Sequence, residues 1–306
     1  MKALRFAALG DSLTEGVGDP VGGGWRGWAA LLAEGLAPAE VPVEFRNFAT
    51  SGAQSADVLL RQLPSALAFA PDVASVVVGV NDTLRATFDI HAVAAHLDTV
   101  YGAFAEQDAV LLTACLPDPG ALLGLPGVLA RPLARRQRAV NSVVHALSQR
   151  HGAVHLHAAD AAWAADRALW SADRLHPGER GHRQFAARFH DVLAAAGVAL
   201  GPAPGVEPER PAPTRAAGLW WLATAGTGWV ARRCADLLPE LLALAADEVR
   251  HDMRGTGARL DLRASAGVAA ALASVSGLEV PLLACDHVTG AAGTAPGTSR
   301  PCEVCA

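Results

Sequence analysis

Short apolar segments alternate with longer segments of helical periodicity along the first two thirds of the chain. The apolar segments are continuous rather than alternating in polarity, which is typical of parallel strands that are covered on both faces. We predict strands at Ala3–Leu9, Val43–Phe48, Val73–Gly79, Ala109–Cys115 and Ala153–His157. The predicted helices are Trp25–Leu36, Ser55–Leu67, His91–Glu106, Pro132–Arg150 and Glu179–Ala196. This regular alternation indicates a three-layer α/β/α domain with a central parallel sheet.

The alternation ends near Val198, and the chain divides there into further parts. We assign residues 1–200 to the α/β domain and residues 201–218 to a stiff Pro-rich linker. Residues 219–251 are predicted to be a Trp-bearing amphipathic helical extension, kinked or divided at Pro239. Residues 252–306 are rich in Ala and Gly and are predicted to be poorly ordered for the most part, with a short helix or strand considered for Val268–Leu283.

The helical extension has several possible roles. Thr227 is placed to cap its helix, and the apolar positions Val230, Cys234, Leu237, Leu241 and Leu244 share one face. The simplest interpretation is that this face packs against the α/β domain. A lid over a functional site, a dimer contact and a membrane-surface helix remain alternatives. The acidic residues of the segment argue against the membrane-surface helix.

Composition and charge exclude several classes of protein. The 306 residues are 51% hydrophobic and 18% charged, which is ample for a sizeable core. The net charge of −5 and the absence of a basic stripe argue against a nucleic-acid partner. The longest apolar stretches, such as Val73–Val80 and Val110–Leu116, are too short to span a membrane. No signal peptide is evident, so we expect a cytoplasmic protein.

The spacing of the cysteines and histidines in the sequence matches no metal-binding pattern. Five cysteines suit a reducing compartment, and free thiols are expected at the isolated pair Cys302 and Cys305. His145, His151, His155 and His157 are close in sequence, but no pattern places them on one metal-binding face, so we expect structural or surface roles. The Gly-rich segment 16–24 lacks the spacing of a dinucleotide-binding loop. We therefore predict no metal and no cofactor, and interpret residues 16–24 as a flexible rim of the candidate site that the motifs below indicate.

Four short motifs each follow a predicted strand or precede the last helix of the domain. They are Gly10-Asp11-Ser12-Leu13-Thr14-Glu15-Gly16, Asn47-Phe48-Ala49-Thr50-Ser51-Gly52, Gly79-Val80-Asn81-Asp82 and Asp173-Arg174-Leu175-His176. The carboxyl ends of parallel strands meet at one edge of a sheet, where functional residues collect. An acyl-transfer site needs a nucleophile, a base and a carboxylate that orients the base. Ser12, His176 and Asp173 supply these three groups.

In their order and residues these motifs resemble the SGNH hydrolases, also called GDSL-type esterases and lipases. The resemblance runs from about Lys2 to Ala196 and implies a flavodoxin-like sheet. It implies hydrolysis of carboxylic esters, from small molecules or lipids, through an acyl-enzyme on Ser12. It further implies an oxyanion hole formed by the backbone N–H groups of Ser12 and Gly52 and the side-chain amide of Asn81.

Other interpretations of these residues remain. Taken singly, each motif is explained by a helix cap or a turn. The same acyl-enzyme also serves an acyltransferase or a biosynthetic deacylase, and a third alternative is a non-catalytic binding module on the same fold. Trp25 and Trp28 are candidates to line an acyl pocket, but core positions suit them equally well. The oligomeric state and the natural acyl group do not follow from the sequence.

Overall fold

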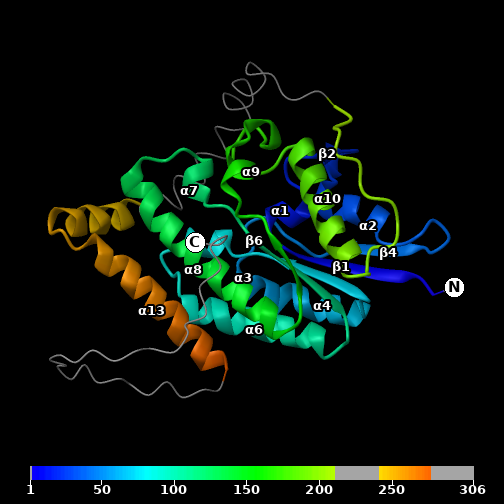
Figure 1. The fold of residues 1–306 in the computed structure, drawn as a ribbon, viewed down its shortest axis with the longest axis horizontal. Helices are drawn as coiled ribbons and strands as arrows, with labels where there is room; N and C mark the ends of the chain where they lie inside the picture. The colour runs from blue at the N-terminus through cyan, green and yellow to red at the C-terminus, as the bar shows by residue number, and fades with distance from the viewer. Residues whose placement is uncertain (1, 211–240, 277–306) are drawn as a thin grey trace, which may run out of the picture.

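A five-stranded parallel sheet forms the centre of the computed structural model, which describes residues 2–210 and 241–276 (Figure 1). Its strands lie in the order β4-β1-β5-β6-β7. Their bounds are β1 Leu4–Gly10, β4 Val43–Asn47, β5 Val73–Val77, β6 Val110–Cys115 and β7 Val154–His157. Counted among these strands alone, the order is 2-1-3-4-5, which is the flavodoxin-like order. The predicted α/β/α fold class is therefore confirmed.

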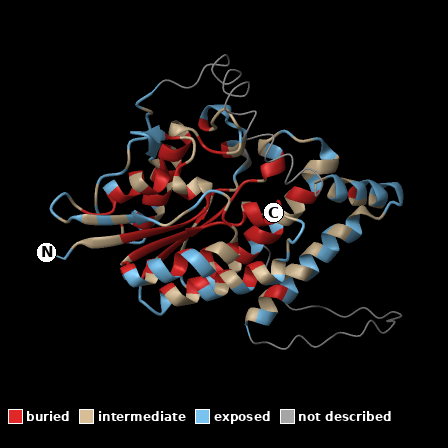
Figure 2. Cartoon of the chain, turned by 180° about the vertical axis from the view of Figure 1, so that it is seen from behind, coloured by how far each residue is buried: buried red, intermediate tan, exposed pale blue. Residues whose placement is uncertain are grey.

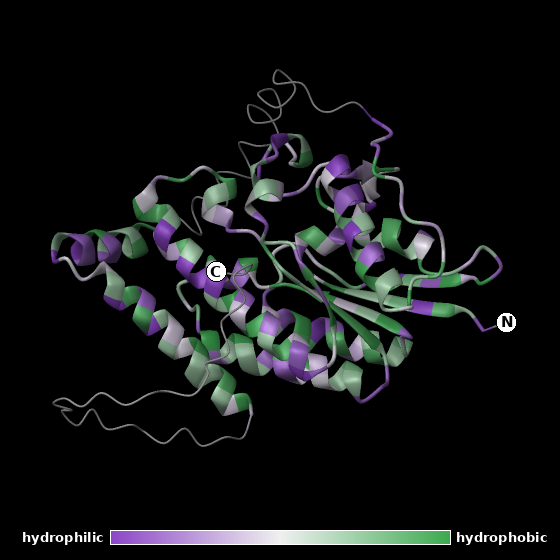
Figure 3. Cartoon of the chain, in the orientation of Figure 1, coloured by the Kyte–Doolittle hydropathy of each residue, from purple (hydrophilic) through white to green (hydrophobic). Residues whose placement is uncertain are grey.

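Helices cover both faces of the sheet. α2 (Gly27–Gly35) and α10 (Glu179–Ala195) pack together on one face, and α4 (Leu63–Phe69), α6 (Ile90–Ala105) and α8 (Gly127–Arg150) lie on the other (Figure 1). The strands β1, β5 and β6 are buried along most of their length, whereas the edge strands β4 and β7 are partly exposed and the outer sides of the helices are exposed (Figure 2). The three buried strands β1, β5 and β6 are predominantly apolar (Figure 3). This distribution explains why the strand segments of the sequence lack alternation.

Aromatic side chains fill the core on the α2 and α10 side. Trp28 is fully buried and stacks on Phe189, with 4.8 Å between the ring centroids, while Phe185 meets both rings edge-on. Burying rings of this size contributes strongly to the stability of the domain. Trp28 is thus a core residue rather than part of a pocket.

The segment after β4 departs from one continuous helix. It comprises α3 (Ser55–Asp57), the π-helical segment η1 (Val58–Gln62) and α4. The side-chain amide of Gln62 pairs with both backbone groups of Gly10: it accepts from the N–H and donates to the carbonyl, each at 2.8 Å. This buried pairing fixes the end of β1, where the chain leaves the sheet.

Short elements surround the carboxyl edge of the sheet. They are α1 (Ser12–Glu15), α5 (Val80–Thr83), α7 (Pro119–Leu122), α9 (Ala161–Ala165) and the 3-10 segment η2 (Arg167–Leu169). The Gly-rich segment forms a two-stranded hairpin, β2 (Pro20–Val21) and β3 (Gly24–Trp25). Residues of α1, α5, α7 and α9 line the candidate site, whereas those of the hairpin do not.

The beginning of the predicted linker lies against the α/β domain. The backbone N–H groups of Glu209 and Arg210 donate to the Glu179 carboxylate, and the Arg210 guanidinium contacts the fully buried Asp19 carboxylate at 3.0 Å. Arg26 bridges Asp19, Glu179 and Glu209. Residues 201–210 are therefore bound along the domain, and residues 211–218 lie outside the described part of the chain.

Helix α13 (Gly257–Val275) corrects the prediction that residues 252–306 are for the most part poorly ordered. It packs against α6 and α8, and Ala271 is fully buried in this contact (Figure 1). Alanine is the best helix former, and this segment contains many alanines, so composition alone was a misleading guide to disorder. Residues 277–306, with the Cys302 and Cys305 thiols, lie outside the described residues.

The predicted Trp-bearing extension is described only at its end. Residues 241–253 are helical, and the buried Glu248 carboxylate in this helix pairs with Arg131 and Arg135 of α8. Thr227, Pro239 and the tryptophans of the extension lie outside the described part. In the parts of the chain that the structure describes, none of the helices combines the length and the apolar character that a membrane span needs.

Candidate active site

Ser12 lies just beyond the end of β1, at the first position of α1. Asp11 precedes it as the N-cap residue, and its side chain accepts a hydrogen bond from the backbone N–H of Leu13 at 3.0 Å. Gly10 has a φ of 146°, and a Cβ at this position would lie 2.2 Å from the Val77 carbonyl oxygen. Only glycine fits this sharp exit from the sheet. The turn thus presents the Ser12 hydroxyl at the carboxyl edge of the sheet.

Ser12, His176 and Asp173 are connected by two short hydrogen bonds. His176 Nε2 lies 2.7 Å from Ser12 Oγ, and His176 Nδ1 lies 2.6 Å from Asp173 Oδ2. An ionised carboxylate only accepts, so Nδ1 carries the proton and Nε2 faces the serine hydroxyl with its lone pair. The structure therefore brings together the three residues that were predicted from the sequence to form a catalytic triad.

The loop that carries His176 holds the Asp173 carboxylate in place. Asp173 Oδ1 accepts from the backbone N–H groups of Leu175 and His176 at 3.0 Å and from the Ser171 hydroxyl at 2.7 Å. Burial raises the pKa of Asp173, but the hydrogen bonds and charge of His176 outweigh it and bring the pKa to about 2. Asp173 is thus a carboxylate at neutral pH.

Asn81 lies in α5, beyond β5, and its buried amide faces Asp11. Asn81 Nδ2 donates to Asp11 Oδ2 at 3.2 Å and to the backbone carbonyl of Ala53 at 3.1 Å. Burial is the main cause that raises the pKa of Asp11 to about 6. The amide is therefore held between the residue before Ser12 and the residue after Gly52.

Gly52 lies in the loop that follows β4, with a φ of 83°. The loop is tied to the nucleophile region on two sides. Thr50 N–H donates to the Gly10 carbonyl at 3.2 Å, and the backbone and hydroxyl of Ser51 donate to the Glu15 carboxylate. These contacts place the Gly52 loop beside α1, although Gly52 itself does not line the pocket described next.

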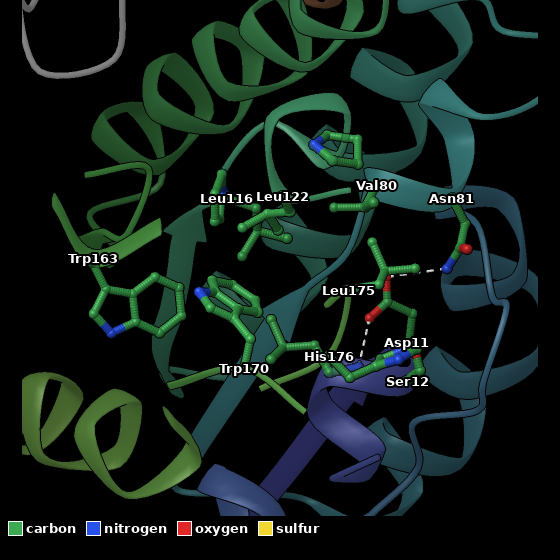
Figure 4. Close-up of a pocket in the computed structure, with 13 residues that line it drawn as sticks. Asp11, Ser12, Val80, Asn81, Leu116, Leu122, Trp163, Trp170, Leu175 and His176 are labelled. Carbon is green, nitrogen blue, oxygen red and sulfur yellow. Dashed lines mark hydrogen bonds between the residues drawn. The ribbon is translucent and has the colours of Figure 1, made fainter. Parts of the chain in front are cut away.

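A pocket opens directly above Ser12 and His176 (Figure 4). Its base is polar, with Asp11, Ser12, Asn81 and His176. Its walls are apolar, and they are formed by Leu13, Val80, Leu116, Pro117, Pro119, Leu122, Trp163, Trp170 and Leu175. A site with this division fits a substrate that has a polar reacting group and an apolar body.

Trp163 and Trp170 supply an aromatic wall of the pocket, a role for which the sequence offered Trp25 and Trp28 as candidates beside a core role. Their rings meet edge-on, 4.9 Å apart, on the segment between β7 and His176 (Figure 4). Trp25 is instead 46% exposed on the β2-β3 hairpin, and none of residues 16–24 lines the pocket. In the sequence, Trp163 and Trp170 lie between a predicted strand and the Asp173 motif, but their spacing alone does not indicate that both reach the pocket.

A second cluster forms where the sequence indicated no shared face. The rings of His145, His155 and His157 lie 4.8 to 5.2 Å apart, between α8 and β7, with Cys115 beside them. His151 is separate and pairs with Asp98. Burial, followed by the charges of His157 and His145, lowers the pKa of His155 to about 3. His155 and His157 alternate along one strand, which puts both on the same face.

Comparisons with known proteins agree with this geometry. Residues 8–184 match the GDSL-like lipase/acylhydrolase family. No curated protein sequence matches the chain. Among solved structures, the psychrotrophic esterase EstA from Pseudoalteromonas sp. is similar at 20% identity, with 63% of this chain and 97% of that chain covered and a TM-score of 0.50.

Two further solved structures have comparable similarity. Axe2, an acetylxylan esterase from Geobacillus stearothermophilus, has 20% identity over 62% of this chain and 94% of its own, with a TM-score of 0.50. TesA has 21% identity over 62% of this chain and 98% of its own, with a TM-score of 0.50. At these identities the structures establish the shared fold. With the family match over more than half of its length, the chain belongs to the GDSL-like lipase/acylhydrolase family.

Proposed function

We propose that this protein is a serine hydrolase that cleaves carboxylic esters through an acyl-enzyme on Ser12. The observation that carries the proposal is the hydrogen-bonded series Asp173–His176–Ser12, with 2.7 Å between His176 Nε2 and Ser12 Oγ. A hydroxyl is a weak nucleophile until a neighbouring base removes its proton. The series supplies that base in the required tautomer and lies at the base of a pocket.

Acylation begins when Ser12 Oγ attacks the ester carbonyl carbon and its proton passes to His176 Nε2. The C=O electron pair moves to the carbonyl oxygen and forms a tetrahedral oxyanion. Asp173 stabilises the positive charge that develops on the imidazole. As the oxyanion collapses, the bond to the alkoxy group breaks, and His176 gives its proton to the leaving alcohol. Ser12 is then an ester of the acyl group.

Deacylation repeats these steps with water as the nucleophile. His176 takes a proton from the water while the water oxygen attacks the acyl carbon. Collapse of the second oxyanion breaks the bond to Ser12 Oγ, which regains its proton from His176. The products are a carboxylic acid and an alcohol, and the resting state returns.

The oxyanion requires hydrogen-bond donors aimed at its position. We assign this role to the backbone N–H groups of Ser12 and Gly52 and to the Asn81 amide. Two features support the assignment. As the first residue of α1, Ser12 has a backbone N–H without an acceptor inside the helix. The Asn81 amide is buried beside Asp11 and lines the pocket.

The apolar walls favour an ester with an apolar acyl or alcohol portion. Leu116, Leu122 and Trp170 face this space, and no ionisable side chain other than Asp11 and His176 lines it among the described residues. Apolar walls bind an apolar group by removing its surface from water. EstA, one of the similar structures, is an esterase, which supports an ester as the bond that is cleaved.

An acyltransferase or a biosynthetic deacylase would use the same acyl-enzyme with another acceptor. A non-catalytic binding module is the alternative of a different class. A binding module does not need the short hydrogen bond between Ser12 and His176, whereas a hydrolase does, so the hydrolase is favoured.

Hydrolysis of p-nitrophenyl esters from acetyl to long acyl chains, with wild type beside Ser12→Ala, tests the proposal. We expect wild-type turnover that is lost in the variant, and covalent labelling of wild type by a fluorophosphonate. Labelling without hydrolysis would favour a transferase, which the product formed with added alcohols would reveal. A folded wild type that neither hydrolyses nor is labelled would favour the binding module.

A further inference from the structure

Three potential metal ligands from two neighbouring strands converge between the sheet and α8. The ligand atoms of Cys115, His155 and His157 all lie within 4.8 Å of one another. Cys115 and His157 end β6 and β7 and are register partners, while His155 is opposite Thr113. None of the three lines the Ser12 pocket. The strand pairing, which is rigid, therefore sets the positions of all three side chains.

The hydrogen bonds around His155 determine which ring nitrogen is available. Ser148 Oγ donates to the Val144 carbonyl at 2.6 Å, so its hydrogen is already used when it meets Thr113 Oγ1 at 2.6 Å. Thr113 must donate to Ser148, and its oxygen then accepts from His155 Nδ1–H at 2.8 Å. The lone pair of His155 is consequently on Nε2, which lies 3.1 Å from Cys115 Sγ.

This arrangement matches that of a metal-binding histidine. Such a histidine donates one ring N–H to a second group, which fixes the tautomer, and binds the metal through the other nitrogen. Thr113 performs the first part here. Zinc binds sulfur at about 2.3 Å and histidine nitrogen at about 2.0–2.1 Å, which puts tetrahedral ligand atoms roughly 3.3–3.8 Å apart. The present separations, 3.1 Å between Cys115 Sγ and His155 Nε2 and at most 4.8 Å among all three ligand atoms, bracket this range.

We propose that Cys115, His155 and His157 form a binding site for a divalent metal ion of the zinc class. The ligand set of one thiolate and two imidazoles suits Zn²⁺, and it does not suit Mg²⁺ or Ca²⁺, which prefer oxygen. The ion replaces the proton of the Cys115 thiol, which is released to solvent.

His145 lies over the same cluster from α8. Its ring centroid is 5.2 Å from those of His155 and His157. Its Nδ1 is buried and has no hydrogen-bond partner among the described residues. A tetrahedral ion with three protein ligands has one remaining coordination position. The neighbouring imidazole of His145 is the candidate ligand for that position.

Cobalt titration of the full-length chain tests this site. The protein is prepared without a polyhistidine tag, stripped of metal, and carries Ser in place of Cys234, Cys285, Cys302 and Cys305. Cys115 is then the sole thiol. We expect one Co²⁺ to bind per chain with a thiolate-to-cobalt charge-transfer band, which added Zn²⁺ removes as it displaces the cobalt.

Variants identify the ligands. Cys115→Ala should abolish the band, and His155→Ala and His157→Ala should weaken binding at least about tenfold. Thr113→Val should weaken it by about 10–100-fold through the lost orientation of His155. The matched control His91→Ala removes an exposed histidine of α6 and should leave binding unchanged. Circular dichroism verifies that each variant folds.

Two results would overturn the proposal. One is the absence of a charge-transfer band in the folded chain that retains Cys115. The other is a band that survives both His155→Ala and His157→Ala. In either case the Cys115–His155 contact is a hydrogen bond within a packed cluster. The test does not depend on ester hydrolysis, so its outcome is separate from that of the proposed function.

Discussion

The side-chain amide of Asn81 donates a hydrogen bond to the Asp11 carboxylate at 3.2 Å, and its second hydrogen is directed to the Ala53 carbonyl at 3.1 Å. The residue before the proposed nucleophile therefore orients a proposed oxyanion donor. Both hydrogens have acceptors in the resting site, so an oxyanion competes with one of them. This pairing keeps the amide in place between turnovers.

Replacement of Asn81 tests its role in the proposed oxyanion hole. Asn81→Ala should lower kcat about 10²–10³-fold, because one donor to the oxyanion is lost, while KM changes little. Asn81→Asp keeps the size of the side chain but lacks the amide donor, and it should lose at least as much. Steady-state kinetics with p-nitrophenyl esters measure both effects. An unchanged kcat in Asn81→Ala would place the amide outside the hole.

The buried Asp11 carboxyl predicts a pH dependence of stability. Its pKa of about 6 in the folded chain lies above the usual 3.8, so the folded state binds more protons between these values. Stability from this group is complete below about pH 4 and is lost as the pH rises through 6, by about 3 kcal/mol. Urea unfolding of wild type and Asp11→Asn between pH 4 and 7 measures this.

The free energies of unfolding of the two proteins should change relative to each other over this range. As the pH rises, the free energy of unfolding of wild type should fall relative to that of Asp11→Asn. A constant difference between the two proteins does not affect this comparison. A difference that is independent of pH would show that Asp11 does not titrate in this window.

Asp173→Asn tests the orientation of His176. Asparagine keeps the shape but removes the charge that holds the Nδ1–H tautomer, so kcat should fall about 10⁴-fold. Asp166→Asn is a matched control, because Asp166 is exposed and asparagine still caps the following turn. Kinetics and thermal melts of both variants make the comparison. Equal kcat values in the two variants would contradict a triad role for Asp173.

Leu122→Trp tests the apolar wall. Leu122 lines the pocket from the short helix α7, and a larger side chain there should fill space that a long acyl chain needs. We expect kcat/KM to fall roughly tenfold for long-chain esters and little for acetyl esters. The control Leu123→Trp alters the adjacent residue, which does not line the pocket. A uniform loss across chain lengths would show that acyl groups bind elsewhere.

Local patterns predicted the fold well because buried parallel strands differ clearly from amphipathic helices. β7, for example, lies within one residue of its predicted bounds. Ser12, Asp173 and His176 are brought together as expected, since two of them belong to a single tight turn. Helix α13 was anticipated only in part, by the short helix or strand considered for Val268–Leu283, because its Ala-rich sequence gives little periodic signal. Its burial depends on α6 and α8, which are distant in sequence.

Side-chain clusters that depend on register were also missed. Cys115 meets His157 only because β6 and β7 pair with that particular offset. Trp163 and Trp170 reach the pocket because the segment after β7 folds back before His176. Such contacts between distant segments are set by tertiary packing, which sequence spacing alone does not specify.

The most direct test of the account is the mass of the peptide that contains Ser12 after rapid acid quench with a p-nitrophenyl ester. We predict a mass increase equal to the acyl group less the hydroxyl hydrogen that it replaces, located on Ser12 and absent in Ser12→Ala. An active wild type whose acyl group is never found on Ser12, or a Ser12→Ala variant that retains full turnover, would contradict the proposed acyl-enzyme mechanism.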